Sequence, residues 1–131
     1  MKNVSATTTR ILVVEDEPVI SRVCLQTLTS EGFEVDVAIN GRMASGMLEK
    51  GAYDLVLIDI RTPVMNGKQL YQSIVQKHRE MTNRVVFTTG DMLSGDTKSF
   101  LEECRKPFLV KPFTPNELKS VVREVLRLLP K

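Results

Sequence analysis

Short apolar segments alternate five times with segments of helical periodicity, and this alternation constrains the fold more than any other feature of the chain. The apolar segments are ILVV (11–14), FEVDVA (33–38), LVLI (55–58), VVFT (85–88) and FLV (108–110). Four of them predict strands that are buried on both faces, whereas the alternating segment 33–38 predicts an edge strand. Strands that alternate with helices are joined by right-handed crossovers, so the pattern predicts a parallel sheet between two layers of helices.

Helix-start signals follow the predicted strands. Candidate starts lie at Pro18, Asn40, Asn66, Asp96 and Thr114. The strongest is TPNE (114–117), which combines a capping box with proline at the first helical position. The helix that follows Pro18 is expected to turn Val19 towards the core. The fourth predicted helix, 96–104, has few apolar residues, and we expect it to be the element that moves.

The length of 131 residues fits one domain, and the composition argues against several classes of protein. A net charge of +2 without a long basic run argues against direct nucleic-acid binding. No apolar run approaches the ~20 residues of a membrane span, and no secretory signal opens the chain. Cys24 and Cys104 lie far apart, which indicates reduced thiols. We therefore expect a soluble, cytoplasmic protein with a flexible leader or linker remnant at 1–9 and a single domain at 10–131.

Polar side chains follow four of the five predicted strands. They are Glu15-Asp16-Glu17 after the first, Asp59 after the third, Thr88-Thr89-Gly90-Asp91 at the end of the fourth, and Lys111-Pro112 after the fifth. In a doubly wound sheet, ligands bind outside the carboxyl ends of the strands. The sequence therefore predicts that these groups converge on one site.

The predicted site has the chemistry of phosphoryl transfer. Carboxylates near 4 Å from one another repel by roughly 4 kcal/mol per pair at an effective dielectric of 20, so the acids require a cation or raised pKa values. Mg²⁺ prefers such oxygen ligands. Asp59 can then act as a nucleophile that forms an aspartyl phosphate, with Lys111 and Thr89 contacting the phosphoryl oxygens and Gly90 leaving room for the group.

These residues resemble the receiver domain of two-component response regulators, of the chemotaxis-regulator type. The resemblance covers residues 10 to about 129 and rests on the motifs LVVEDEP, LVLIDIRTPVMNG, FTTGD and LVKPF. It implies a flavodoxin-like (βα)5 sandwich whose five-stranded parallel sheet has the order 2-1-3-4-5. The resemblance also implies a set of site residues: Asp59 as phosphoacceptor, Glu15, Asp16, Asp59 and the backbone carbonyl of Arg61 as ligands of Mg²⁺ or Mn²⁺, Thr89 and Lys111 as catalytic contacts, Thr89 and Phe108 as a switch pair, and a cis bond before Pro112.

The same resemblance implies a bacterial phosphorelay protein that signals through the face formed by the fourth helix, the last strand and the last helix. The donor would be a sensor histidine kinase or a histidine phosphotransfer protein, and a homodimer could form through the same face. Such a domain catalyses its own phosphorylation and dephosphorylation without a separate substrate. The segment from Thr88 to Phe113 resembles receivers attached to hybrid sensor histidine kinases, so the chain could stand alone or be part of one.

Three positions depart from the family pattern. Phe108 stands where many relatives have tyrosine, so the inward state of the switch gains no hydroxyl hydrogen bond. Thr62 takes a place often held by methionine, and Glu15 is longer than the usual aspartate. We also expect Arg61 and Asp91 to form an ion pair that gates the phosphoryl group, with two independent solvated charges as the alternative.

Two other functions compete with a phosphorylated receiver. An aspartyl-nucleophile phosphatase or phosphotransferase resembles the pattern DxDx[TV], but Arg61 stands where its second aspartate is required, and the chain leaves no room for a substrate cap. A pseudo-receiver would be an interaction module without phosphorylation. Mg²⁺ binding that depends on Asp59 and Asp16 would distinguish it from a true receiver.

Overall fold

The computed structural model describes residues 8–91 and 94–129, so most of the predicted leader and the last two residues of the predicted domain lie outside it. Five strands form one parallel sheet in the order β2-β1-β3-β4-β5. The strands are β1 (Arg10–Val14), β2 (Glu34–Ala38), β3 (Leu55–Asp59), β4 (Val85–Thr89) and β5 (Phe108–Val110). The helices are α1 (Pro18–Ser30), α2 (Gly41–Lys50), α3 (Gly67–Lys77), α4 (Gly95–Cys104) and α5 (Pro115–Leu128). The predicted fold and strand order are confirmed.

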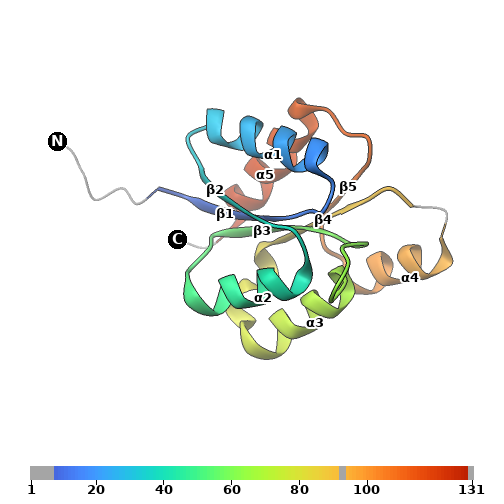
Figure 1. Ribbon diagram of the computed structural model, residues 1–131. Helices are drawn as coiled ribbons and strands as arrows, with labels where there is room; N and C mark the ends of the chain where they lie inside the picture. The colour runs from blue at the N-terminus through green and yellow to red at the C-terminus, as the bar shows by residue number, and fades with distance from the viewer. Residues whose placement is uncertain (1–7, 92–93, 130–131) are drawn as a thin grey trace.

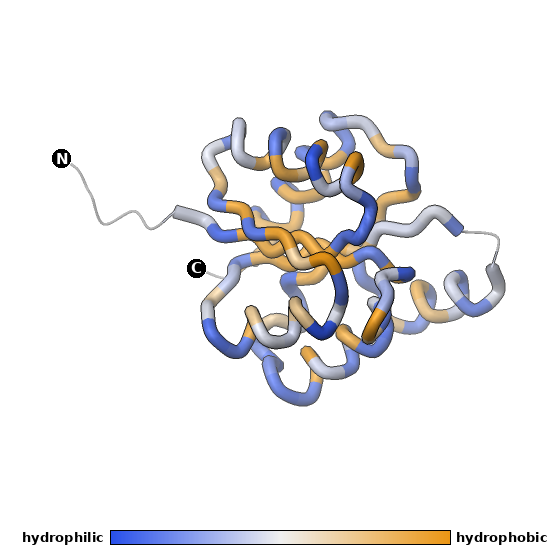
Figure 2. The backbone as a smooth tube through the Cα atoms, viewed as in Figure 1, coloured by the Kyte–Doolittle hydropathy of each residue, from blue (hydrophilic) through white to orange (hydrophobic). Residues whose placement is uncertain are grey.

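Helices cover both faces of the sheet, α1 and α5 on one side and α2, α3 and α4 on the other (Figure 1). The apolar colour of the central strands in Figure 2 follows from this arrangement, because both faces of these strands are buried. Alternate residues of β1, β3 and β4 belong to two separate hydrophobic cores. Val13 and Leu57 pack towards α1 and α5, whereas Val14 and Ile58 pack on the side of α2 and α3.

The helices begin close to where their capping signals stand in the sequence. Asn40 accepts a hydrogen bond from the Met43 amide, and Asn66 and Thr114 each form a reciprocal capping box. Gly67 fixes the start of α3 against the end of β3, since a Cβ at this position would lie 2.6 Å from the Cα of Ile60. This close approach holds the loop after Asp59 in place.

Three features differ from the sequence prediction. Strand β5 is a second edge rather than a strand buried on both faces, and it exposes Phe108 by 40% and Val110 by 43%. Val19 in the first turn of α1 is 75% exposed, whereas Cys24 and Leu28, further along the helix, reach the core. A 3-10 helix, Arg79–Arg84, follows α3 without having been predicted. Among the described residues, every helix is too short or too polar to cross a bilayer.

Candidate functional site

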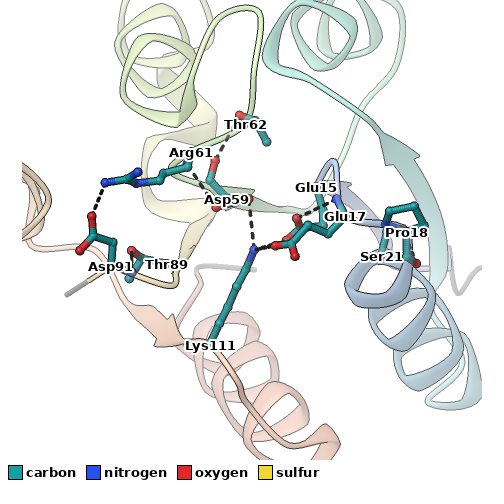
Figure 3. A network of polar contacts seen from close by, with 10 residues as sticks. All are labelled: Glu15, Glu17, Pro18, Ser21, Asp59, Arg61, Thr62, Thr89, Asp91 and Lys111. Atoms are coloured by element: carbon teal, nitrogen blue, oxygen red, sulfur yellow. Dashed lines mark hydrogen bonds and ion pairs between the residues drawn. The ribbon is translucent and has the colours of Figure 1, made fainter. Parts of the chain in front are cut away.

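The carboxyl ends of β1, β3, β4 and β5 meet at a cavity of about 370 Å³. The cavity is lined by Asp16, Glu17, Asp59, Arg61, Gly90, Asp91 and Lys111. Figure 3 shows the side chain of Lys111 reaching across this space towards Asp59 on one side and Glu15 and Glu17 on the other. The predicted convergence of the strand-end residues is thus observed.

Asp59 ends β3 with only 4% of its surface exposed. One carboxylate oxygen, Oδ1, accepts a hydrogen bond from the Arg61 amide at 3.1 Å, and the other, Oδ2, lies 3.2 Å from the ammonium of Lys111. The aspartate is held in place by β3 because the strand continues into the turn that donates the Arg61 amide. A buried, oriented carboxylate therefore faces the cavity.

Lys111 is the cation at the centre of the site. Its Nζ lies 2.9 Å from Oε1 of Glu15, 3.0 Å from Oε1 of Glu17 and 3.2 Å from Oδ2 of Asp59. Burial favours the neutral amine, but hydrogen bonds to Glu15 and Glu17 outweigh it and raise the pKa of Lys111 above its ordinary value. The ammonium stays charged and serves as the counter-ion of the three carboxylates.

Glu15 is 3% exposed, and its burial raises its pKa from 4.5 to about 7. The negative charge of Asp59 acts in the same direction, whereas the hydrogen bond from Lys111 opposes it. The single ammonium of Lys111 therefore does not stabilise the full negative charge of its three carboxylate partners. The site has more negative charge than its own lysine neutralises.

The donor set fits a small divalent cation. Glu15, Glu17 and Asp59 each offer a carboxylate oxygen, and these oxygens lie within 4.8 Å of one another. Asp16 lines the same cavity. Carboxylate oxygens with room for water are the ligands that Mg²⁺ and Mn²⁺ take. An acidic cluster able to bind a metal is thus present.

Arg61 and Asp91 form an ion pair at the rim of the cavity, on the opposite side from Glu17 (Figure 3). The pair is solvent-exposed, with 63% of the Arg61 side chain and 31% of the Asp91 side chain accessible. Asp91 is held from its other side, because its Oδ1 accepts the amide of Ser94 at 3.1 Å. The expected pairing of these two residues is observed, whereas its effect on a phosphoryl group remains a prediction.

The two predicted switch residues lie on neighbouring strands. Thr89 is fully buried at the end of β4, where its Oγ1 accepts the amide of Asp91 at 3.1 Å. Phe108 opens β5 opposite Phe87, two positions before the partner of Thr89, and its ring is turned partly to solvent. Because residues two apart on a strand share a face, Thr89 and Phe108 project to the same side of the sheet. That geometry permits a movement of Thr89 to change the position of the Phe108 ring, but this coupling remains a prediction.

Two further positions have clear local geometry. The bond between Lys111 and Pro112 is cis. Thr62 is 2% exposed, and its hydroxyl donates to the backbone carbonyl of Asp59 at 3.2 Å. Thr62, which departs from the family pattern, therefore stabilises the turn after Asp59.

Glu17 was expected at the site with the other strand-end residues, but the sequence predicted no role for it. It belongs to the acidic run after β1, but only its neighbours Glu15 and Asp16 were expected to bind metal. Its contact with Lys111 joins residues 94 positions apart. One local signal exists: Glu17 directly precedes Pro18 at the start of α1, where a residue that caps with its side chain is usual.

Comparison with known proteins identifies the family. The response regulator receiver domain model matches residues 11–123. The transcriptional regulatory protein PcoR of Escherichia coli is 36% identical over 118 residues, which are 90% of this chain and 51% of that protein. The chain thus spans about half the length of this relative.

Solved structures of receiver domains superpose closely on the chain. The receiver domain of sensor histidine kinase PA1611 from Pseudomonas aeruginosa, solved with a magnesium ion in its active-site cleft, has a TM-score of 0.83 at 29% identity. That similarity covers 92% of this chain and 99% of the other. The receiver domain of a histidine kinase from Syntrophus aciditrophicus has a TM-score of 0.86 at 26% identity and covers 95% and 94% of the two chains. The chain belongs to the response regulator receiver domain family of two-component signalling proteins.

Proposed function

We propose that Asp59 accepts a phosphoryl group from a phosphohistidine on a partner protein and that the phosphorylated chain signals through altered protein binding. One observation carries the proposal: a carboxylate with 4% exposure lies at a solvent-open cavity, with one oxygen held by a backbone amide and the other 3.2 Å from a lysine ammonium. A structural ion pair has no need of an adjoining cavity lined by additional carboxylates. The arrangement suits a nucleophile whose product carries negative charge.

The transfer requires one bond to form and one to break. An oxygen of Asp59 forms the new O–P bond while the P–N bond of the donor imidazole breaks, and the imidazole leaves with that electron pair. Lys111 follows the negative charge from the carboxylate to the phosphoryl oxygens, a movement of its long side chain alone. Thr89 supplies a hydroxyl donor at the end of β4, and Gly90 leaves open space beside Lys111. These roles require positioning and charge neutralisation, which phosphoryl transfer depends on.

We assign Glu15, Asp16, Asp59 and the backbone carbonyl of Arg61 as the candidate ligands of Mg²⁺ or Mn²⁺. The ion, when bound, would neutralise phosphoryl oxygens that Lys111 alone does not. Support comes from the clustered carboxylate oxygens and from the magnesium ion in the related PA1611 receiver. The protein's own part is to hold Glu15 and Asp59 as buried carboxylates, with Asp16 at the cavity wall.

The proposed output is a change of the face formed by α4, β5 and α5. Drawing the Thr89 hydroxyl towards a phosphoryl group would vacate space on the side of the sheet that Phe108 shares. The half-exposed ring of Phe108 could then turn inwards and bury apolar surface. The exposed Phe108 and Val110 make this face a candidate contact surface for a second copy of the chain or for another partner.

The phosphoryl donor in this proposal is a sensor histidine kinase or a histidine phosphotransfer protein. Receiver domains of two histidine kinases are structural relatives, which favours a place in or beside a hybrid kinase. The near-neutral net charge of +2 gives no basis for direct nucleic-acid contact. Both cysteines are free thiols, as in a reducing compartment, and we place the domain in the cytoplasm.

Phosphoramidate tests the proposal, because it is a small donor with the same P–N bond as phosphohistidine. The parent protein and Asp59→Asn are incubated with it, with and without Mg²⁺, and their intact masses are recorded. The parent should gain one phosphoryl group only with Mg²⁺, and the variant should gain none. Equal labelling of the variant, or no labelling of the parent under conditions that label another receiver, would contradict the proposal.

A further inference from the structure

Glu17 occupies the N-cap position of α1 but does not cap the helix with its side chain. The other four α-helices of the described residues each have an N-cap side chain, from Asn40, Asn66, Ser94 or Thr114, that accepts a backbone amide of the first turn. A side-chain cap stabilises a helix because it accepts a hydrogen bond from a first-turn amide that has no partner within the helix. At α1 this local contribution is absent, and the glutamate is directed elsewhere.

The carboxylate of Glu17 is directed at Lys111, with Oε1 3.0 Å from Nζ. The Glu17 amide meanwhile donates to Oε2 of Glu15 at 3.2 Å, so the same turn orders two of the three carboxylates around the ammonium. Figure 3 shows Glu17 on the α1 side of the ammonium, opposite the side from which Asp59 approaches. The N-terminus of α1 is thus tied to the catalytic lysine.

The three partners of Lys111 differ in their freedom to leave it. Glu15 and Asp59 have 3% and 5% of their side chains exposed, whereas Glu17 has 58% exposed. A carboxylate on the rim can turn into water and be solvated when it leaves the ammonium. A buried carboxylate that loses the ammonium stays buried without a counter-ion, which is costly. Glu17 is therefore the partner that Lys111 can exchange most easily.

We infer that Glu17 is a positioning residue that retains Lys111 in the resting site and competes with the phosphoryl group for its ammonium. This inference rests on the proposed function, in which Lys111 contacts the phosphoryl oxygens. Glu17 thereby sets how readily the lysine becomes available, and it weakens the phosphorylated state relative to a site without it. Because the Glu17 carboxylate is largely exposed, its pair with Lys111 should lower the affinity of the site for a phosphoryl group by a factor of only about two to five.

The first experiment measures the contact in the metal-free protein. Hydrogen exchange of the Lys111 ammonium, followed by ¹⁵N-edited NMR, should be faster in both Glu17→Gln and Glu17→Asp than in the parent. The aspartate keeps the charge but is one methylene too short to span the contact. Asp91→Asn is the matched control, because it removes a carboxylate of the same cavity that pairs with Arg61 instead. It should leave Lys111 exchange unchanged.

The second experiment measures competition with a phosphoryl analogue. Beryllofluoride is titrated into each protein in saturating Mg²⁺, and binding is followed by NMR. Glu17→Gln and Glu17→Asp should both bind about two- to fivefold more tightly than the parent. If only Glu17→Gln binds more tightly, the effect is one of overall charge and the inference is wrong. It is also wrong if neither variant differs, whereas a parent that binds no beryllofluoride would instead refute the proposed function.

Discussion

The two ends of the sheet carry polar networks of opposite character. At the carboxyl edge, Lys111 faces Glu15 and Asp59, whose side chains are 3% and 5% exposed. At the amino edge, Arg10 and Arg84 face Asp36 and Asp54, whose side chains are 46% and 47% exposed. The first network buries more negative charge than its lysine neutralises, and the second leaves its carboxylates in contact with water.

The amino edge is satisfied by its own residues. The guanidinium of Arg10 donates to Asp36 at 3.2 Å and to the carbonyl of Ala52 at 3.1 Å, and it lies 4.8 Å from the centre of the Tyr53 ring. The hydroxyl of Tyr53 donates to Asp36 at 2.6 Å, and burial, followed by this contact, raises the pKa of Tyr53 to about 12. Each group has a partner, so this network holds the start of β1 to its neighbours.

Exposure and charge balance, rather than the number of ion pairs, distinguish the ligand site at the carboxyl edge from the stabilising network at the amino edge. Ion pairs between solvated partners contribute little to the free energy of unfolding and need no further ligand. Buried carboxylates short of cations are costly, and they persist where a ligand completes them. Substitutions at the two edges should therefore have separable effects on stability and on phosphorylation.

Among these substitutions, removal of the Lys111 ammonium should change the free energy of unfolding most. We expect Lys111→Met to lower the free energy of unfolding by about 3 kcal/mol in chelator, because two buried carboxylates lose their cation. Mg²⁺ should restore part of this loss by occupying the same carboxylates. Urea denaturation with and without Mg²⁺ measures both quantities. Parent-like stability in chelator would contradict a buried charge deficit.

The free energy of unfolding should depend on pH through Glu15. Its pKa is raised from 4.5 to about 7, chiefly by burial, so between these values the folded protein binds a proton that the unfolded chain has lost. The contribution of Glu15 therefore falls as pH rises through this window. Relative to the parent, Glu15→Gln should gain roughly 2 kcal/mol above the upper value in metal-free buffer, and little below the lower one. Chemical denaturation across the window tests this, and a constant difference would contradict it.

The amino edge should respond in stability alone. Arg10→Ala loses the stacking on Tyr53 and the pair with Asp36, and we expect a loss of about 1 kcal/mol. Labelling by phosphoramidate should keep its parental rate and Mg²⁺ dependence. Arg10→Lys keeps the charge but not the planar stacking, so its free energy of unfolding should lie between those of the parent and Arg10→Ala. A change in labelling rate would break the separation of the two edges.

The smallest expected effect is that of the Arg61–Asp91 ion pair on the rate of dephosphorylation. If Arg61 and Asp91 together hinder the approach of water, Arg61→Ala and Asp91→Ala should each lose the phosphoryl group faster, by about two- to fivefold. The decay of the phosphorylated mass after removal of the donor measures this rate. Parental decay in both variants would show that the ion pair does not hinder the attack of water.

Much of the fold was predictable because its signals are local. The apolar segments, the caps at Asn40, Asn66 and Thr114, and Pro18 at the start of α1 each act within a few residues. Strand order came from the family resemblance. The errors at Val19 and β5 share one cause: periodicity identifies apolar residues but does not tell whether another element covers them.

The candidate site was predictable only in part for a similar reason. Parallel strands bring their carboxyl ends together, which placed Asp59 and Lys111 in one cavity. The contact between Glu17 and Lys111 and the network of Arg10 with Tyr53 depend on side-chain directions that only packing determines. Thr62 likewise had no physical explanation until its hydroxyl was seen on the Asp59 carbonyl.

Calorimetric titration with Mg²⁺ tests most directly whether the charge deficit at the carboxyl edge is a ligand site. We expect one saturable Mg²⁺ site in the parent. Its affinity should fall at least about tenfold in Asp16→Asn, because the loss of even an outer-shell partner has an effect of this size. Arg10→Ala should bind as the parent does, because it alters only the amino edge. Absence of binding in the parent, or equal binding by Asp16→Asn, would contradict the account and favour a phosphorylation-independent interaction module.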